Sequence, residues 1–211
     1  LQTSDESFSN VYIGNQAGYK SIGGNYNIFI GEQAGFSNML SYANIALGFQ
    51  SGFSIEDGND NVFIGTLAGY TMATGWHNVY IGNRTGYSSN NAWGNVYLGY
   101  ESGYSTTSGG ANTFVGTRTG FSVTTGYSNT CMGIEAGYSL DTACCNTFMG
   151  DHAGYYVTSG FNNVYLGAYS GYHNSQSEVE SYANVFIGNE SGFNSVEGFA
   201  NVMIGHRAGY N

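Results

Sequence analysis

The chain has 211 residues, a formal net charge of −10 and only four Lys or Arg residues, so its surface repels phosphate backbones and anionic membranes. Charged residues make up 9% of the chain and Pro is absent, a composition typical of neither an average globular enzyme nor a disordered tail. No apolar run reaches the roughly 18 residues that a membrane-spanning helix needs. We therefore expect no nucleic-acid partner and no membrane insertion.

The first nine residues, LQTSDESFS, lack the glycines and the regular spacing found in the rest of the chain. We interpret residues 1–9 as a linker or a degenerate cap, and residues 10–211 as a single repeat domain. The chain begins at Leu1 without Met, which we take to indicate a processed form or a piece of a longer fibre. The final unit ends at Asn211 without a polar cap, which predicts either an excised fragment or rods that stack end to end.

A unit typified by Asn61 to Tyr70, NVFIGTLAGY, recurs twelve times between residue 10 and the end of the chain. Each unit begins at an Asn, and the interval between these residues is 17 except for one interval of 21. Numbering each unit from its Asn, positions 5 and 9 are always Gly and position 10 is always Tyr or Phe. Fixed-period similarity of this kind is typical of solenoids. The first residues of the units are Asn10, Asn27, Asn44, Asn61, Asn78, Asn95, Asn112, Asn129, Asn146, Asn163, Asn184 and Asn201.

Positions 1 to 4 form a short run of Asn, β-branched, aromatic and aliphatic residues that ends at the glycine of position 5. Such a run predicts a short strand, and about seven polar residues after position 10 then return the chain. A 17-residue period is too short for a strand–helix–strand unit, and no segment shows a helical apolar period. We therefore predict an all-β chain, a parallel β-solenoid or β-roll of twelve coils stacked about 4.8 Å apart in a rod on the order of 55 to 60 Å long.

Stacking turns each position into a column that runs along the rod. The Asn column at position 1 is expected to hydrogen-bond up and down the stack, because amide side chains both donate and accept. The column at position 10 mixes Tyr and Phe freely, so we expect its ring edges to reach solvent or a polar partner.

The column at position 7 alternates in charge through Arg84, Glu101, Arg118 and Glu135, and His152 follows in the next coil. Opposite charges at the stacking distance attract, whereas like charges would repel. We predict that this charge ladder fixes the register of the coils. A row of arginines that binds carbohydrate or phosphate is the functional alternative, which the alternation disfavours.

The column at position 3 is mostly aromatic, and side chains alternate across a strand, so it must point away from positions 2 and 4. Both faces of the strand are therefore apolar, although one coil encloses only one of them. We predict that the column at position 3 faces a second copy of the chain in a homo-oligomer, a trimer in the first instance. The candidate interface residues are Tyr12, Phe29, Phe63, Tyr80, Tyr97, Phe114, Phe148, Tyr165 and Phe186.

The repeated pattern N-V-x-I-G-x-x-A-G-Y resembles repeats in the head regions of trimeric autotransporter adhesins, and it is also similar to repeats of phage-type tail-fibre proteins. The likeness covers residues 10–211. It implies a left-handed parallel β-roll, a homotrimeric rod and surface attachment. The 17-residue period and the aromatic position 3 depart from the usual adhesin head unit.

Other candidate sites have equally simple structural interpretations. Four residues are inserted in the coil spanning 163–183, around His173 to Tyr182, and inserted loops often carry function. The run Glu56 to Asp60 offers oxygen ligands but lacks the spacing of a calcium loop. Position 16 is a row of aromatic residues that either stacks on sugars or packs within the fibre: Tyr42, Trp76, Trp93, Tyr127, Phe161, Tyr182 and Phe199.

The four histidines occupy different columns, and no acid pair or nucleophile triad can be placed, so we predict no catalytic residues, no metal and no cofactor. We expect a non-enzymatic, extracellular segment of a fibre at a cell or virion surface. Its role would be to act as a spacer and to attach to surfaces. Its partners would be further copies of itself, as a homotrimer or an end-to-end filament, and a surface glycan or protein receptor. An ice-binding or carbohydrate-binding solenoid is the alternative from another class.

Overall fold

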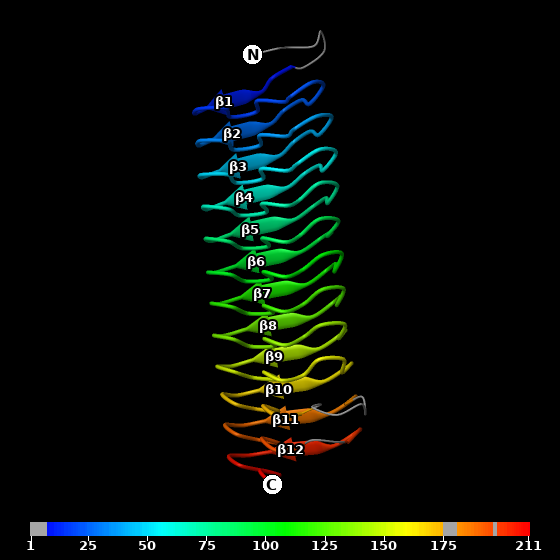
Figure 1. Ribbon diagram of the computed structural model, residues 1–211. Coiled ribbons are helices and arrows are strands. Elements are labelled where there is room, and N and C mark those ends of the chain that lie inside the picture. Colours follow the sequence, from blue (N-terminus) through cyan, green and yellow to red (C-terminus); the bar gives the residue numbers. More distant parts are fainter. Residues whose placement is uncertain (1–7, 175–180, 196–197) are drawn as a thin grey trace.

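The computed structural model describes residues 8–174, 181–195 and 198–211 as an all-β chain. Twelve three-residue strands pair in parallel, and their order in the sheet is their order in the sequence. Figure 1 shows the coils stacked in one column, with the first and last strands at opposite ends. The predicted parallel β-solenoid is therefore confirmed. The strands are β1 Val11–Ile13, β2 Ile28–Ile30, β3 Ile45–Leu47, β4 Val62–Ile64, β5 Val79–Ile81, β6 Val96–Leu98, β7 Thr113–Val115, β8 Thr130–Met132, β9 Thr147–Met149, β10 Val164–Leu166, β11 Val185–Ile187 and β12 Val202–Ile204.

Two of the sequence predictions fall largely outside the described residues. Residues 1–7 hold most of the predicted linker or cap, and residues 175–180 hold the centre of the predicted insertion. Within the described ranges, no helix has the length and apolarity that crossing a lipid bilayer requires.

Each strand covers positions 2 to 4 and not 1 to 4. At position 1 the backbone N–H bonds to the side chain of the Asn in the preceding coil and not to a backbone carbonyl, as it would in a strand. The backbone N–H of Asn112 donates to Oδ1 of Asn95 in the preceding coil at 2.9 Å. Its Nδ2 donates to the same oxygen at 3.1 Å and to the carbonyl of Gly126, at position 15 of its own coil, at 2.9 Å. The predicted Asn column is thus confirmed, and it joins the two sides of a coil as well as successive coils.

The invariant glycines at positions 5 and 9 have separate steric reasons. Gly82, at position 5, has φ +139°, and a Cβ there would collide with the carbonyl oxygen of Gly99 in the next coil. Gly86, at position 9, has φ +57°, and a Cβ there would overlap the ring of Tyr80 in its own coil. Position 5 therefore permits close stacking of backbones, and position 9 makes room for the residue at position 3.

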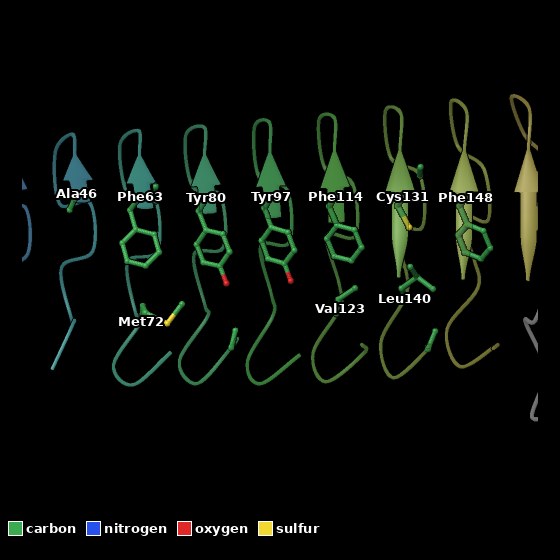
Figure 2. Packing of buried hydrophobic residues seen from close by; sticks show 14 of the residues in the cluster. Ala46, Phe63, Met72, Tyr80, Tyr97, Phe114, Val123, Cys131, Leu140 and Phe148 are labelled. Atoms are coloured by element: carbon green, nitrogen blue, oxygen red, sulfur yellow. The ribbon is translucent and has the colours of Figure 1, made fainter. Parts of the chain in front are cut away.

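The column at position 3 fills the interior, so the prediction that it faces a second copy of the chain is wrong. Phe63, Tyr80, Tyr97 and Phe114 have no exposed surface in the single chain, and Figure 2 shows their rings pointing into the coils. An aromatic ring fills the narrow space between strand and return, which the shorter aliphatic residues of positions 2 and 4 would leave partly empty. The other candidates on the same column are Tyr12, which is half-buried, and Phe29, Phe148, Tyr165 and Phe186, which are fully buried.

The residue at position 12 complements the residue at position 3 of the same coil. Where position 3 is small, as at Ala46 and Cys131, position 12 is the larger Ile55 or Leu140. In these two coils the aliphatic side chain lies against the glycine of position 9, where Met203 lies in the last coil and an aromatic ring lies in the others. In these two coils the larger residue at position 12 compensates for the small residue at position 3, whereas Phe63 is paired with the large Met72.

The polarity of position 12 also matches the residue at position 3 where that residue is Tyr, because a buried phenol needs a hydrogen-bond partner. All four tyrosines of position 3 meet Ser, Thr or Asn at position 12. Tyr12 bonds to Ser21 at 2.8 Å, Tyr97 to Thr106 at 3.1 Å and Tyr165 to Asn174 at 2.8 Å. Only the pair Tyr80 and Ser89 keeps both hydroxyls buried without a hydrogen bond within the described residues.

The complementarity of positions 3 and 12 predicts the outcome of a compensated swap. Ala46→Phe alone should destabilise the fold by about 1 to 3 kcal/mol, because Ile55 already fills the space that the new ring needs. Adding Ile55→Ser, which copies the Phe186 and Ser195 coil, should restore most of that loss. Urea unfolding monitored by circular dichroism measures both. If the loss of stability from Ile55→Ser simply added to the loss from Ala46→Phe, that result would contradict the pairing.

Candidate interaction surfaces

The outer face of the sheet is a continuous apolar surface, which we call the outer sheet face and define as positions 2 and 4 of all twelve coils. Position 2 holds Val, Ile or Thr, and position 4 holds Ile, Leu, Val or Met, without one charged residue in either column. These side chains are exposed or half-buried throughout. In the middle of the rod, Val96 and Leu98 are 42% and 45% exposed. The sequence correctly implied that both strand faces are apolar. It wrongly placed position 3 on the outside, whereas position 3 is buried and positions 2 and 4 face outward.

The charge ladder forms as the sequence predicted. Glu101 lies between two arginines, with 3.4 Å to Nη1 of Arg84 and 3.1 Å to Nε of Arg118. Arg118 also reaches Glu135 at 3.7 Å. The side chain of Glu101 is only 8% exposed, so it is the most enclosed member of these ion pairs. Arg207 and Glu190 form a further pair in the last two coils, at 2.6 Å.

The enclosure of Glu101 has opposing effects on its carboxyl group. Burial alone would raise the pKa, whereas hydrogen bonds from Tyr100, Arg118 and Arg84 lower it, and the balance lies below the ordinary value of 4.5. The folded state therefore favours the ionised form of Glu101. This contribution to stability is present above the pKa of the unfolded chain and is lost as the pH falls through the folded value.

The column at position 10 is an unbroken stack of twelve aromatic rings from Tyr19 to Tyr210. All eleven neighbouring pairs have ring centroids between 4.8 and 5.4 Å apart. Apart from the exposed Tyr19, these residues are half-buried. Because each ring face is covered by the next ring, the column presents ring edges and hydroxyl groups to its surroundings.

The aromatic residues of position 16 stack only in part. Trp76 and Trp93 stack at 6.0 Å and are 47% and 42% exposed, and Tyr182 stacks between Phe161 and Phe199 at 5.0 Å on each side. Asn59, Gly110 and Cys144 interrupt the row, so Tyr42 and Tyr127 have no aromatic neighbour in this column. The row is therefore divided into short stacks and single exposed rings.

A denser cluster that the sequence reasoning missed surrounds His152. Its Nδ1 lies 2.8 Å from Asp151 and its Nε2 lies 3.0 Å from Glu135, while its ring stacks on Tyr155 and Tyr169. In the next coil, Tyr172 packs against the same group, and burial raises its pKa to about 12. Treating the columns one at a time hid this cluster, because its members come from positions 6, 7 and 10 of adjacent coils.

The His and acidic residues of the described ranges do not gather into a metal centre. No group of three or more His, Cys, Asp or Glu residues there is placed to hold a metal ion. Among the carboxylates of Glu56, Asp57 and Asp60, one lies within ion-pair distance of a histidine: Asp60 is 3.6 Å from His77. His152 pairs with Glu135 and Asp151 within the charge ladder rather than with a nucleophile.

Comparison of the chain with family models, with curated proteins and with solved structures found no match.

Reversing the sign of the ladder should weaken the stack. Glu101→Arg with Glu135→Arg would place four arginines in successive coils, so neighbouring charges would repel. We expect a lower melting temperature at low salt and partial recovery at high salt, because counterions screen the repulsion. Thermal melts in two salt concentrations check this, with Glu56→Arg and Asp57→Arg together as the control for the same change in net charge at exposed residues. Unaltered melting would count against a role in register.

Acid should abolish the contribution of Glu101. Because folding lowers its pKa, wild type should be more stable than Glu101→Gln at neutral pH, and the difference should shrink as the pH falls below 4.5 and through the folded pKa. Glu56→Gln, at an exposed carboxylate with no ion pair within the described residues, should show no such pH-dependent difference. Urea midpoints of the three proteins across pH measure the effect. A difference that persists unchanged in acid would show that the ion pairs do not stabilise the fold.

Proposed function

We propose that this chain is a non-enzymatic rod, a segment of an extracellular fibre whose role is spacing and surface attachment, and that it works as a homo-oligomer. The observation that carries the proposal is the outer sheet face: its strands stack from β1 to β12 (Figure 1), and its two columns hold no charged residue. A fibre segment needs a stiff repeating backbone and a surface through which copies associate. Both properties are built into every coil.

The size of the outer sheet face supports association between copies. Eleven spacings of about 4.8 Å give a length on the order of 50 Å, and side chains two apart on a strand lie about 7 Å from each other. The strip therefore covers on the order of 350 Å² before the relief of its side chains is counted, within the range of the largest apolar patches on monomers. Three residues at position 6, Phe49, Tyr100 and Ile134, are also apolar and exposed.

A second copy is the occupant that best fits this surface. The face is straight and regular, so a partner that covers it must itself be long and regular, and another rod meets that requirement along its entire length. Since both partners would bring the same uncharged columns, no buried charge would need compensation. Three copies is the number that the resemblance to adhesin heads implies, and the extracellular location rests on the same resemblance.

The distribution of chemistry along the rod favours a structural role over catalysis. Outside the cluster around His152, the arginines of the described coils lie in the surface column of position 7, and the interior of these coils is filled mainly by the residues of positions 3 and 12. For ice binding, the alternative function, a flat lattice of free Thr hydroxyls would be needed. Thr107 instead donates to the backbone of Thr124, and the flat sheet face is mainly Val and Ile.

Light scattering on the purified chain tests the proposal. We expect wild type to be oligomeric, and Ile64→Thr, Ile81→Thr and Leu98→Thr together to release monomers with an unchanged circular dichroism spectrum, since Thr suits exposed strand positions. Thr74→Ala, Asn91→Ala and Ser108→Ala alter the return of the same coils and should leave the oligomer intact.

A monomeric wild type would overturn the proposed self-association. Electron microscopy separates the remaining possibilities, because lateral association gives short thick rods, whereas end-to-end stacking gives filaments that lengthen with concentration. Thermal hysteresis in the same samples would instead support the ice-binding alternative.

A further inference from the structure

Two groups of three consecutive tyrosines occur within the aromatic column at position 10. In the first, Tyr70 and Tyr87 stack with centroids 5.1 Å apart at 9°, and Tyr87 and Tyr104 stack at 5.1 Å and 5°. In the second, Tyr155 lies 4.9 Å from Tyr138 and 5.4 Å from Tyr172. The ring planes are nearly parallel in every one of these pairs except Tyr155 and Tyr172, which are tilted by 30°, so neighbouring phenols lie face to face along the column. Phe53 and Phe121 bound the first group, and Phe121 and Phe193 bound the second.

The hydroxyl groups of the first group are not used by the fold. Within the described residues, those of Tyr70, Tyr87 and Tyr104 form no hydrogen bond to the protein, and the three side chains are half-exposed. Four other coils have Phe at the same position, so stacking there does not require a hydroxyl. By contrast, the tyrosines of position 3 are enclosed, and Tyr97 and Tyr165 donate to or accept from partners inside the coil.

We propose that the tyrosines of position 10 are a site of oxidative covalent modification, in which adjacent coils become joined by dityrosine bonds. The reaction needs an external one-electron oxidant, for which a haem peroxidase with hydrogen peroxide is sufficient. Each of two neighbouring phenols loses one electron and one proton and becomes a phenoxyl radical. The radicals form one carbon–carbon bond between their ortho carbons, and the two ortho hydrogens move as protons to the oxygens, which restores both hydroxyl groups. Hydrogen peroxide accepts the two electrons and two protons and gives two water molecules.

The column geometry favours this coupling for two physical reasons. The second phenol is already held beside the first, so radical coupling proceeds without the loss of translational freedom that a bimolecular encounter requires. Half-exposed rings can also tilt about their side-chain torsions, as bond formation demands, with little repacking of the interior. Joining successive coils covalently would prevent the rod from unravelling at its surface, and it would do so whether or not the rod associates with other copies.

The chain contains its own control for exposure. Tyr80 and Tyr97, at position 3, stack at 4.8 Å and 4°, at least as closely as the tyrosines of position 10, but both are fully buried. An oxidant that reaches only the surface should therefore leave this pair uncoupled. A comparison of the two columns separates the effect of exposure from the effect of distance.

Peroxidase and hydrogen peroxide applied to the folded full-length chain test the inference. A mixture of isotope-labelled and unlabelled protein, digested and analysed by mass spectrometry, distinguishes bonds within one molecule from bonds between molecules. We expect Tyr70–Tyr87 and Tyr87–Tyr104 bonds within single molecules, and none between Tyr80 and Tyr97. Tyr87→Phe should abolish both bonds of the first group and leave Tyr138–Tyr155, whereas Tyr138→Phe should leave the first group intact.

Three results would overturn the inference. They are the absence of dityrosine at an oxidant dose that couples free tyrosine, dityrosine that forms only between molecules, and the same pattern of bonds in chain unfolded by urea. Tyr87→Phe should melt within experimental error of wild type before oxidation, since Phe occupies this position in other coils. The oligomeric state of the sample decides none of these outcomes, so failure here is separate from failure of the proposed fibre role.

Discussion

The buried asparagine column is the interaction on which the rest of the solenoid depends. One amide at position 1 accepts two hydrogen bonds from the next coil and donates to the preceding coil and to the return of its own coil. It therefore fixes the closure of the coil and its register at the same point. Only an amide fits this role, because a carboxylate has no donor and a column of buried carboxylates would repel. Removing one amide would leave backbone groups unsatisfied in the interior, at about 1 to 3 kcal/mol each.

Closure by asparagine leaves a core only one side chain thick. A 17-residue coil encloses the residue at position 3, its complement at position 12 and the small residue at position 8. Neighbouring coils contribute their own rings at the next level of the stack, so the interior of the described coils is filled by side chains. The columns on the surface are the parts of these coils that a partner can contact.

The surface columns differ from one another in chemistry, and most of them keep one chemical character along the rod. The outer sheet face is apolar, position 7 is mostly polar and in its middle charged, and position 10 is aromatic with free ring edges. A molecule of this design presents the same stripe to a partner at every coil, which suits association along a fibre better than recognition at one point. The cluster around His152 is the main local exception.

The sequence alone determined the coil, its period, the strand, the asparagine column and the charge ladder, because each follows from residues that recur at one spacing. It could not decide which face of the strand points inward, since aromatic position 3 and aliphatic positions 2 and 4 are both apolar. Volume decided that question: only rings fill the space opposite the strand. Nor did the sequence show that positions 7 and 17 adopt left-handed backbone conformations, as at Arg118 with φ 52° and Ala111 with φ 54°. Apart from Gly94 and Asn162, these positions do not hold the Gly or Asn that favour such conformations, and the hydrogen bonds to adjacent coils, formed after stacking, hold them there.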